Sequence, residues 1–328
     1  MRRLWIFAAL AAVFLLSGCA AQSAETTFFA MDTVMSVRIW GRDARDACGA
    51  VQEQVEQLER ELSVTDEDSA LAQLNASGSG ALPGDALTLL RSALDLSART
   101  GGALDPTLYP AVRLWGFTTG DYRVPSDVEI ADALSRAGAE HVSIDGDTVT
   151  LSDGAMLDFG AVAKGYAAQK CADFLSDGIT AALLSFGGNV QTIGDKPDGT
   201  AWHIGVQDPF GDGTAAALTL TGANAVVTSG GYQRYFEENG VRYCHILDPK
   251  TGAPADSGLS SVTIVASDGL FADGLSTALY VMGLSAAADF WRDSSDFEAV
   301  FITDDGEIFY TAGLSGCIDA DGAEVIER

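Results

Sequence analysis

The fold class is indicated by residues 180–228, TAALLSFGGNVQTIGDKPDGTAWHIGVQDPFGDGTAAALTLTGANAVVT. Several short apolar runs follow one another here, separated by turns that contain glycine and aspartate. The predicted strands are Thr180–Phe186, Trp202–Gln207, Ala216–Thr221 and Ala225–Thr228. Because strand follows strand without an intervening helix, a doubly wound parallel sheet is disfavoured, and the segment predicts a mixed α+β domain.

Helices are predicted on both sides of this strand-rich segment. From Ala44 to Leu62, apolar residues recur at three- and four-residue steps, which is typical of a helix with one buried face. Ser126, with Glu129 three residues later, has the pattern of a capping box. The other predicted helices cover 85–100, 161–177 and 269–282, further strands cover 33–39 and 261–266, and hairpin turns lie at Asp145-Gly146, Asn239-Gly240 and Asp305-Gly306.

The chain is strongly acidic. Among its 328 residues, 19 are Lys or Arg and 46 are Asp or Glu, which gives a formal net charge of −27. Such a surface repels phosphate backbones and anionic lipid headgroups, so nucleic acid is not an expected partner. The 47% hydrophobic content excludes a mainly disordered chain. No fixed repeat or Pro-rich linker divides the sequence, so we expect one catalytic domain.

The first residues have the pattern of a lipoprotein signal peptide. Arg2 and Arg3 precede an apolar run from Leu4 to Leu16, which is too short to span a bilayer comfortably. Small residues then precede Cys19, which is expected to be lipidated and to become the mature N-terminus. An uncleaved membrane anchor is the alternative. The predicted divisions are a signal peptide over 1–18, a lipidated tether over 19–26 and one catalytic domain over 27–328.

This pattern also predicts where the protein resides. We expect export and attachment by lipid to the outer face of the cell membrane, because the acidic body would not bind anionic lipid by itself. The remaining cysteines show no C-x-x-C pair, so a thiolate metal site is not expected. Their disulfide state is left open by the sequence; they are Cys48, Cys171, Cys244 and Cys317.

Residues 157–166, LDFGAVAKGY, form a motif that could bind an anion. The segment is not a P-loop, because Lys164 is followed by Gly165 and not by Ser or Thr. The chain also lacks the other common nucleotide-binding motif, G-x-G-x-x-G after an N-terminal strand. Asp158 precedes a flexible turn and Lys164 lies near the start of a predicted helix, where free N–H groups favour negative charge. A helix cap formed by Asp158 is the alternative interpretation.

Two further positions could carry chemistry. Asp273 and Thr277 are spaced i and i+4 on a predicted helix, so both oxygens face one side and suit a hard cation such as Mg²⁺. A purely structural helix start is the alternative. His245 is one of three histidines, which are scattered, so a single proton acceptor is a simpler hypothesis than a three-histidine metal site. A structural histidine is the alternative there.

Taken in order, these segments resemble the ApbE family of FAD:protein FMN transferases. The resemblance covers nearly all of the mature chain. It rests on Met31-Asp32-Thr33, Leu62-Ser63 with Asp68-Ser69 and Asn75, Asp105-Pro106-Thr107 with Leu114-Trp115-Gly116-Phe117, Asp158 to Tyr166, Ser185-Phe186-Gly187-Gly188-Asn189, Trp202 to Val206 with Asp208-Pro209, Thr228-Ser229-Gly230, His245 to Gly252, and Ala272-Asp273 to Thr277.

The resemblance implies an α+β fold related to T-folds, with FAD bound in a cleft. It implies that Mg²⁺ is held by Asp273, Thr277 and a backbone carbonyl at Ala161, with Asp273 and His245 as catalytic residues. His245 is the candidate base; if its pKa is unperturbed, activity should rise with pH near 6.5. The implied FAD contacts are Met31, Thr65, Trp115, Gly116, Phe117, Asp158, Lys164 and Leu247.

The implied reaction cleaves the FAD pyrophosphate, releases AMP and links FMN to a Ser or Thr hydroxyl of a partner protein as a phosphodiester. The implied acceptor motif is Asp-x-x-(Ser/Thr)-Gly-Ala-(Ser/Thr). The chain has no such motif, so the acceptor should be another polypeptide, such as an exported electron-transfer subunit or an FMN-binding reductase. The alternatives are a Mg²⁺-dependent FAD pyrophosphatase and a non-catalytic flavin-binding lipoprotein.

The sequence departs from the family pattern at two positions. Thr65 occupies a position where many relatives carry a Tyr that packs on the flavin nucleotide, so FAD affinity or release should differ. Asp32 stands where Gly is commoner, and Asp is costlier than Gly where the backbone must approach a ligand closely.

Overall fold

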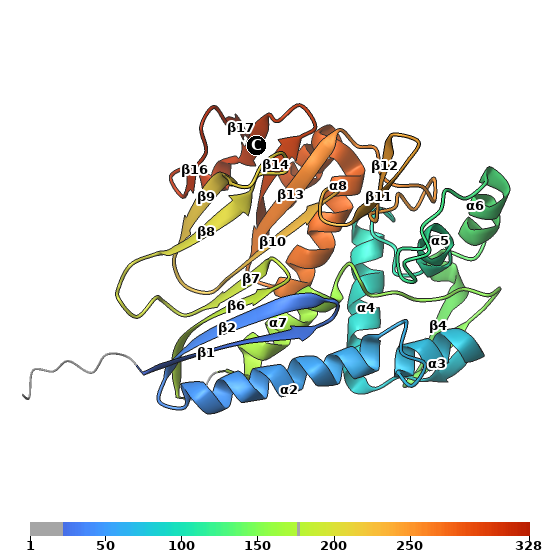
Figure 1. The fold of residues 1–328 in the computed structure, drawn as a ribbon, viewed down its shortest axis with the longest axis horizontal. Coiled ribbons are helices and arrows are strands. Elements are labelled where there is room, and N and C mark those ends of the chain that lie inside the picture. Colours follow the sequence, from blue (N-terminus) through green and yellow to red (C-terminus); the bar gives the residue numbers. More distant parts are fainter. Residues whose placement is uncertain (1–21, 176–177) are drawn as a thin grey trace, which may run out of the picture.

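A large, almost entirely antiparallel sheet organises the molecule. The structure is a computed structural model that describes residues 22–175 and 178–328. The sheet has nine strands in the order β1-β2-β6-β7-β10-β13-β14-β15-β17, so strand order follows chain order (Figure 1). Only the last pair, β15 and β17, is parallel among the described strands. The strands are β1 Ser23–Ala30, β2 Thr33–Gly41, β6 Ile179–Phe186, β7 Asn189–Ile193, β10 Asn224–Gly230, β13 Leu259–Ala266, β14 Phe297–Thr303, β15 Ile308–Thr311 and β17 Glu324–Ile326.

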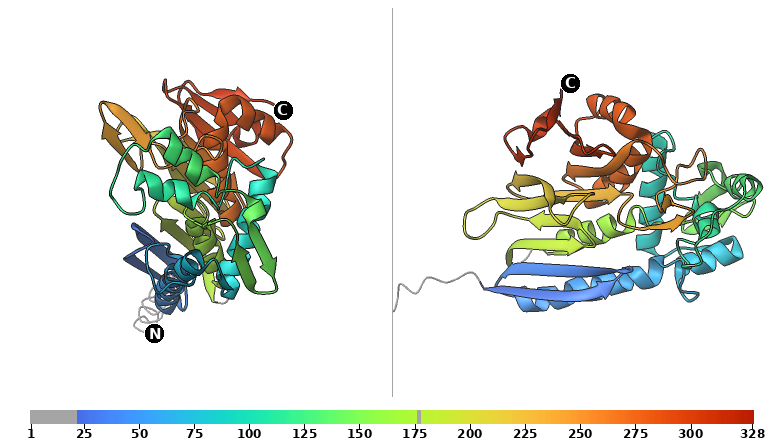
Figure 2. Two further views of the ribbon diagram at one scale, coloured as in Figure 1. Left: turned by 90° about the vertical axis from the view of Figure 1, so that its right-hand side faces the viewer. Right: turned by 45° about the horizontal axis from the view of Figure 1, so that its top comes forward.

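Helices cover one face of this sheet. Val51, Val55 and Leu58 of the first long helix are fully buried and belong to the same core as Val37 and Leu184 on the sheet. These apolar residues follow the helical period in the sequence, so the core is formed by the residues that the pattern predicts. The helices against the sheet are α2 Ala44–Leu62, α7 Ala163–Phe174 and α8 Gly269–Arg292, and α4 Gly84–Arg99 packs against α2 and α8 (Figures 1 and 2).

A small sheet covers part of the opposite face. Val226, Val265 and Val300 point away from the helices and pack against Val206 and Leu218 in a second core. The alternation along each strand therefore places one set of apolar residues in each core. The small sheet has the order β16-β9-β8, with β16 Ile318–Asp319, β9 Thr214–Leu220 and β8 Trp202–Gln207.

Shorter elements gather beyond one end of the large sheet, at the right of Figure 1. Two of them are hairpin-based sheets, β3-β5-β4 and β11-β12. The capping box predicted at Ser126 is present, and hydrogen bonds from the Ser126 main chain and side chain help to lower the pKa of Glu129 to about 2, after the larger effect of Arg123. These elements are α3 Ala70–Ser77, β3 Ser79–Ala81, α5 Tyr109–Trp115, α6 Asp127–Leu134, η1 Ala139–His141, β4 Val142–Asp145, β5 Thr148–Leu151, β11 Tyr235–Glu238 and β12 Val241–Cys244. The short helix η2 Ala312–Leu314 instead follows β15, and its Leu314 belongs to the second core.

The predicted α+β class is confirmed, while several predicted boundaries differ. Strand β1 begins at Ser23, inside the predicted tether. It pairs with β2 along its whole length, and this pairing is possible because its polar residues lie mainly on the exposed face. The helix predicted to end at Met282 continues to Arg292 through a kink at Gly283, and α7 starts at Ala163 instead of residue 161. Cys19 and the signal peptide lie outside the described residues.

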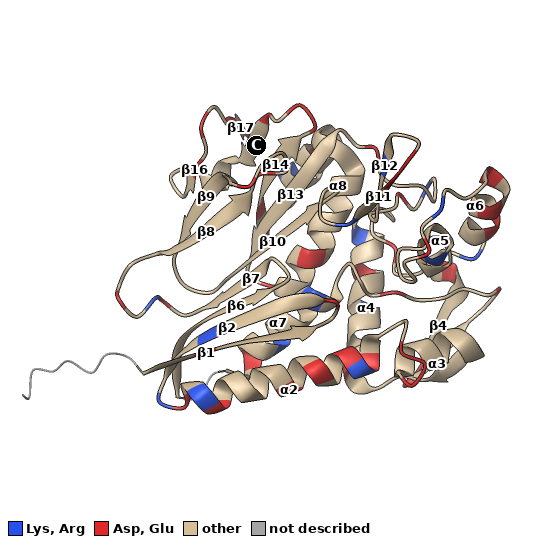
Figure 3. Cartoon of the chain, viewed as in Figure 1, with Lys and Arg blue, Asp and Glu red and all other residues tan. Residues whose placement is uncertain are grey.

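Helix α8 is a buried core helix. It is long and apolar enough to cross a membrane by length and composition, but 56% of the apolar window is buried inside the fold. The four cysteines of the described part are free thiols, and burial raises the pKa of Cys48 and Cys171. Asp and Glu residues recur along α2, α6 and the connecting loops, as the strongly negative net charge leads one to expect (Figure 3).

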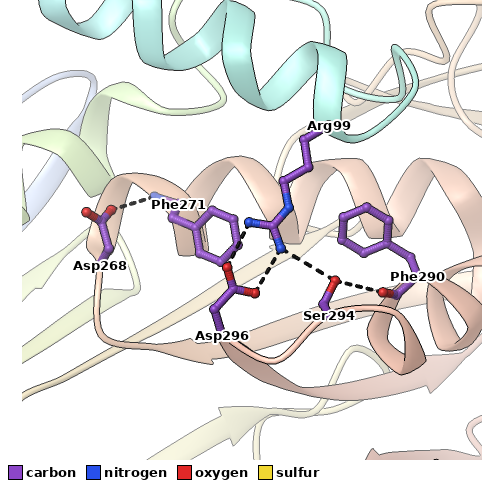
Figure 4. Close-up of polar contacts among 6 residues, drawn as sticks. All are labelled: Arg99, Asp268, Phe271, Phe290, Ser294 and Asp296. Carbon is purple, nitrogen blue, oxygen red and sulfur yellow. Dashed lines mark hydrogen bonds and ion pairs between the residues drawn. The ribbon is translucent and has the colours of Figure 1, made fainter.

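Arg99 fastens the end of α4 to α8 and the segment that follows it (Figure 4). Its guanidinium makes two 2.8 Å hydrogen bonds to the carboxylate of Asp296. It also lies over the rings of Phe271 and Phe290, 4.6 and 5.7 Å from their centroids. The paired hydrogen bonds lower the pKa of Asp296 and raise that of Arg99.

Replacing Arg99 with lysine is expected to lower the free energy of unfolding by about 1 kcal/mol, because an ammonium cannot form the paired hydrogen bonds. Asp296 has a lowered pKa in the folded state, so its contribution is present at neutral pH and is lost as the pH falls below about 4. Urea denaturation at pH 7 and pH 3 measures both effects. Arg136→Lys, in an exposed pair with Asp132, is the control and should change little. An equal loss at both pH values would contradict the ion-pair explanation.

Candidate functional site

The site is built where α7 and α8 cross at two glycines. A Cβ on Gly165 would lie 2.1 Å from the Gly269 carbonyl oxygen and 2.5 Å from Cβ of Asp273, so only glycine permits this approach. The Gly165 N–H donates a 2.8 Å hydrogen bond to Oδ2 of Asp273. The crossing thus carries the start of α7 to the buried carboxylate of α8.

The same hydrogen bond leaves the Ala161 carbonyl without its usual donor. In a regular helix the Gly165 N–H would donate to the carbonyl oxygen four residues earlier, which belongs to Ala161. Here it donates to Asp273 instead, and none of the hydrogen bonds between described residues ends on the Ala161 carbonyl. That oxygen is therefore available to a ligand beside Asp273.

Thr277 lies one turn after Asp273 on α8, as predicted. Its hydroxyl is 3.1 Å from that of Ser229 on β10, and the Ser229 hydroxyl is also 2.7 Å from that of Ser276. Sequence reasoning assigned no role to Ser229. The polar Thr228-Ser229-Gly230 segment was the one feature in the sequence that could have pointed to Ser229. Its partners, Ser276 and Thr277, become visible only through the packing of α8 on β10.

Lys164 provides positive charge among the acidic and titratable groups of the site. Burial raises the pKa of Asp158 and of Asp273, and the Lys164 ammonium opposes both shifts. The Lys164 charge also lowers the pKa of His245. Residues from three predicted motifs are therefore within electrostatic range of one cation.

His245 follows β12 directly and is held by the backbone of Arg234. The Arg234 carbonyl oxygen accepts hydrogen bonds from the His245 main-chain N–H at 3.0 Å and from Nδ1 at 3.1 Å. Because a carbonyl only accepts, Nδ1 carries the proton, and Nε2 keeps a lone pair. Burial, with the charges of Lys164 and Arg234, lowers the pKa of His245 to about 4. The condition of an unperturbed pKa near 6.5 is therefore not met, because burial, which the sequence could not reveal, lowers the pKa.

Asp158 and His245 are partly buried. Both keep some accessible surface, yet burial is the largest influence on the pKa of each. The Asp158 side chain accepts a 2.9 Å hydrogen bond from the Gly160 N–H, but it does not cap the helix, because the N-cap residue of α7 is Val162 and no side chain caps that end. Arg234, which sequence reasoning missed, is also within electrostatic range of both residues.

Trp115 and Phe117 belong to one buried apolar cluster. They are 2% and 1% exposed, and the Trp115 indole donates a 2.7 Å hydrogen bond to the Gly252 carbonyl oxygen. Phe117 lies 6.4 Å from the His245 ring, and Leu247 is buried in the same cluster. Gly116 has φ of 82°, and a Cβ there would lie 2.2 Å from the Asp121 carbonyl oxygen. Flavin contact stays a prediction for these residues.

Met31 and Thr65 are on two other segments. Met31 and Asp32 form the turn between β1 and β2 with φ of 49° and 59°, which explains why a glycine would suit position 32. The Met31 N–H donates to Oε1 of Glu59 at 2.7 Å. Thr65 is exposed in the loop after α2, and the next residue back, Val64, accepts a hydrogen bond from Tyr109. Their flavin contacts also stay predictions.

The donor set fits a small hard cation. Within the described ranges, no group of three or more His, Cys, Asp or Glu side chains could hold a metal ion. Asp273, the Thr277 hydroxyl and the unengaged Ala161 carbonyl instead offer a few oxygen donors, which suits Mg²⁺ because it takes its other ligands from water and phosphate.

The chain is similar to several known proteins. The model of the ApbE family matches residues 31–301. An FAD:protein FMN transferase of Treponema pallidum is 34% identical, with 90% of this chain and 89% of that protein covered. Among solved structures, the ApbE protein of Thermotoga maritima is 35% identical with a TM-score of 0.84, covering 90% and 99% of the two chains. A flavinyl transferase ApbE of Pseudomonas stutzeri is 32% identical with a TM-score of 0.81, covering 90% and 97%.

Proposed function

Because the chain belongs to the ApbE family of FAD:protein FMN transferases, we propose that it moves FMN from FAD to a Ser or Thr hydroxyl of another protein in a Mg²⁺-dependent reaction. The observation that carries the metal requirement is the buried Asp273 carboxylate beside the unengaged Ala161 carbonyl. A bound Mg²⁺ would supply positive charge to the phosphate oxygens. Asp273, Thr277 and Ala161 would hold it.

In this proposal the acceptor hydroxyl oxygen bonds to the FMN phosphorus, and the bond from that phosphorus to the AMP oxygen breaks. The products are a phosphodiester-linked flavoprotein and AMP. The neutral His245 accepts the hydroxyl proton at Nε2, because Nδ1 is already engaged with Arg234. Lys164 offers a cation to the pyrophosphate.

The acceptor is proposed to be an exported protein that carries an Asp-x-x-(Ser/Thr)-Gly-Ala-(Ser/Thr) motif. Mixing enzyme, FAD, Mg²⁺ and such a protein, followed by mass spectrometry, tests the proposal. An FMN adduct supports transfer. Free FMN and AMP without an adduct would indicate a pyrophosphatase, and bound FAD without turnover would indicate a non-catalytic flavin-binding protein.

We also propose that the protein is exported and anchored by lipid at Cys19. Cys19→Ser is expected to abolish lipidation and move most of the protein from the membrane fraction to the soluble fraction, because the acidic body lacks affinity for anionic lipid. Cell fractionation with immunoblotting measures this, and Cys48→Ser, at a buried position inside the fold, is the matched control. Full membrane retention of Cys19→Ser would instead support an uncleaved anchor.

A further inference from the structure

Two buried polar side chains on β7 have atoms without partners. Asn189 is 3% exposed and Gln191 is 2% exposed. Nδ2 of Asn189 and Oε1 of Gln191 make no hydrogen bond with any described residue. A buried unpaired polar group costs about 1–3 kcal/mol, so two on one strand call for an explanation.

Both side chains face α8 near the glycine crossing. A Cβ on Gly269 would lie 3.0 Å from Oε1 of Gln191, so Gln191 lies against the start of the helix. Asn189 is two residues earlier on the same face of β7, a step of about 6.6 Å. Asp273 is one turn after Gly269 on α8, a step of about 6 Å.

These two steps are of similar length, and the Asn189 side chain lies near the Asp273 carboxyl. The Asn189 amide is near enough to favour the charged form of the Asp273 carboxyl, although its geometry falls short of a normal hydrogen bond. The Gly165 N–H already engages Oδ2 of Asp273. Asn189 is therefore a second nearby donor for the Asp273 carboxylate, in addition to the Gly165 N–H.

We propose that Asn189 is a positioning residue that donates from Nδ2 to the Asp273 carboxylate and orients it for the cation. This inference rests on the proposed role of Asp273 as a metal ligand. Partners that orient a metal ligand commonly change metal affinity by about 10–100-fold when they are removed. Nδ2 of Asn189 has no hydrogen-bond partner among the described residues, as expected for a group that acts when the cation is bound beside Asp273.

The matched variants are Asn189→Val and Asn189→Thr, which have similar shapes and differ in the presence of a hydroxyl donor. Both β-branched side chains suit a strand. Mn²⁺ binding is followed by electron paramagnetic resonance, alone and with ADP, which presents a pyrophosphate but no FMN. We expect about 10–100-fold weaker Mn²⁺ binding for Asn189→Val and a smaller loss for Asn189→Thr. The thermal stability of metal-free Asn189→Val should not fall below that of Asn189→Thr.

Gln191→Met is the control on the same strand face and should bind Mn²⁺ within about twofold of the unaltered protein, because Gln191 lies against Gly269 and not Asp273. Equal losses in the Val and Thr variants, unchanged binding in Asn189→Val, or failure of both variants to fold would overturn the inference. Asp273→Asn distinguishes failure of the inference about Asn189 from failure of the proposed metal site. If Asp273→Asn also binds Mn²⁺ normally, the metal site itself is wrongly assigned.

Discussion

Asp273→Asn is expected to lower the rate of FMN transfer by about 10³-fold or more, because it removes the only charged ligand in the proposed Mg²⁺ site. The amide keeps the shape of the side chain and an oxygen for the Gly165 N–H. Transfer rates measured over a range of Mg²⁺ concentrations test the prediction. Thr277→Val, which removes a neutral oxygen, should have a smaller effect.

The same variant should be at least as stable as the unaltered protein when metal is absent. Asp273 is 3% exposed and burial raises its pKa, so the carboxylate is an unfavourable charge in the empty fold. Thermal unfolding without Mg²⁺ therefore distinguishes loss of function from loss of structure. Full activity of Asp273→Asn, or its failure to fold, would contradict the assignment.

His245→Asn is expected to lower turnover by about 10²–10⁴-fold while leaving FAD affinity nearly unchanged, which is the usual effect of removing a general base. Asn can still donate toward the Arg234 carbonyl, so the loop should keep its position. Stopped-time transfer assays and FAD titration separate the two quantities. Loss of FAD binding with normal turnover at saturating FAD would show instead that His245 is a substrate contact.

The pH dependence follows from the environment of this histidine. Only the neutral imidazole accepts a proton, and burial with the nearby charges of Lys164 and Arg234 lowers its pKa to about 4. For free enzyme, kcat/KM should therefore fall as the pH drops through about 4, and the histidine should stay neutral from pH 5 upward. A limb near pH 6.5 that disappears in His245→Asn would contradict this environment.

Local patterns in the sequence determined the class of the fold and several elements. Helical periodicity between Ala44 and Leu62, the capping box at Ser126 and the consecutive strands after Thr180 all depend on neighbouring residues. The i, i+4 spacing of Asp273 and Thr277 likewise follows from helix geometry. Strand β1 escaped prediction because three of the four residues on its exposed face are polar, namely Ser23, Glu25 and Thr27, and pairing with β2 fixes it.

The chemistry of the site was decided by contacts between distant segments. Asp273 meets Gly165 across 108 residues of chain, and that contact alone leaves the Ala161 carbonyl unengaged. Burial of His245 and Trp115 is likewise set by how separate elements pack. Sequence by itself determines conformational preferences over a few residues, since these depend on adjacent side chains. Solvent exclusion, the approach of charges and the pKa values that result depend on the tertiary structure, which brings remote residues within a few ångströms.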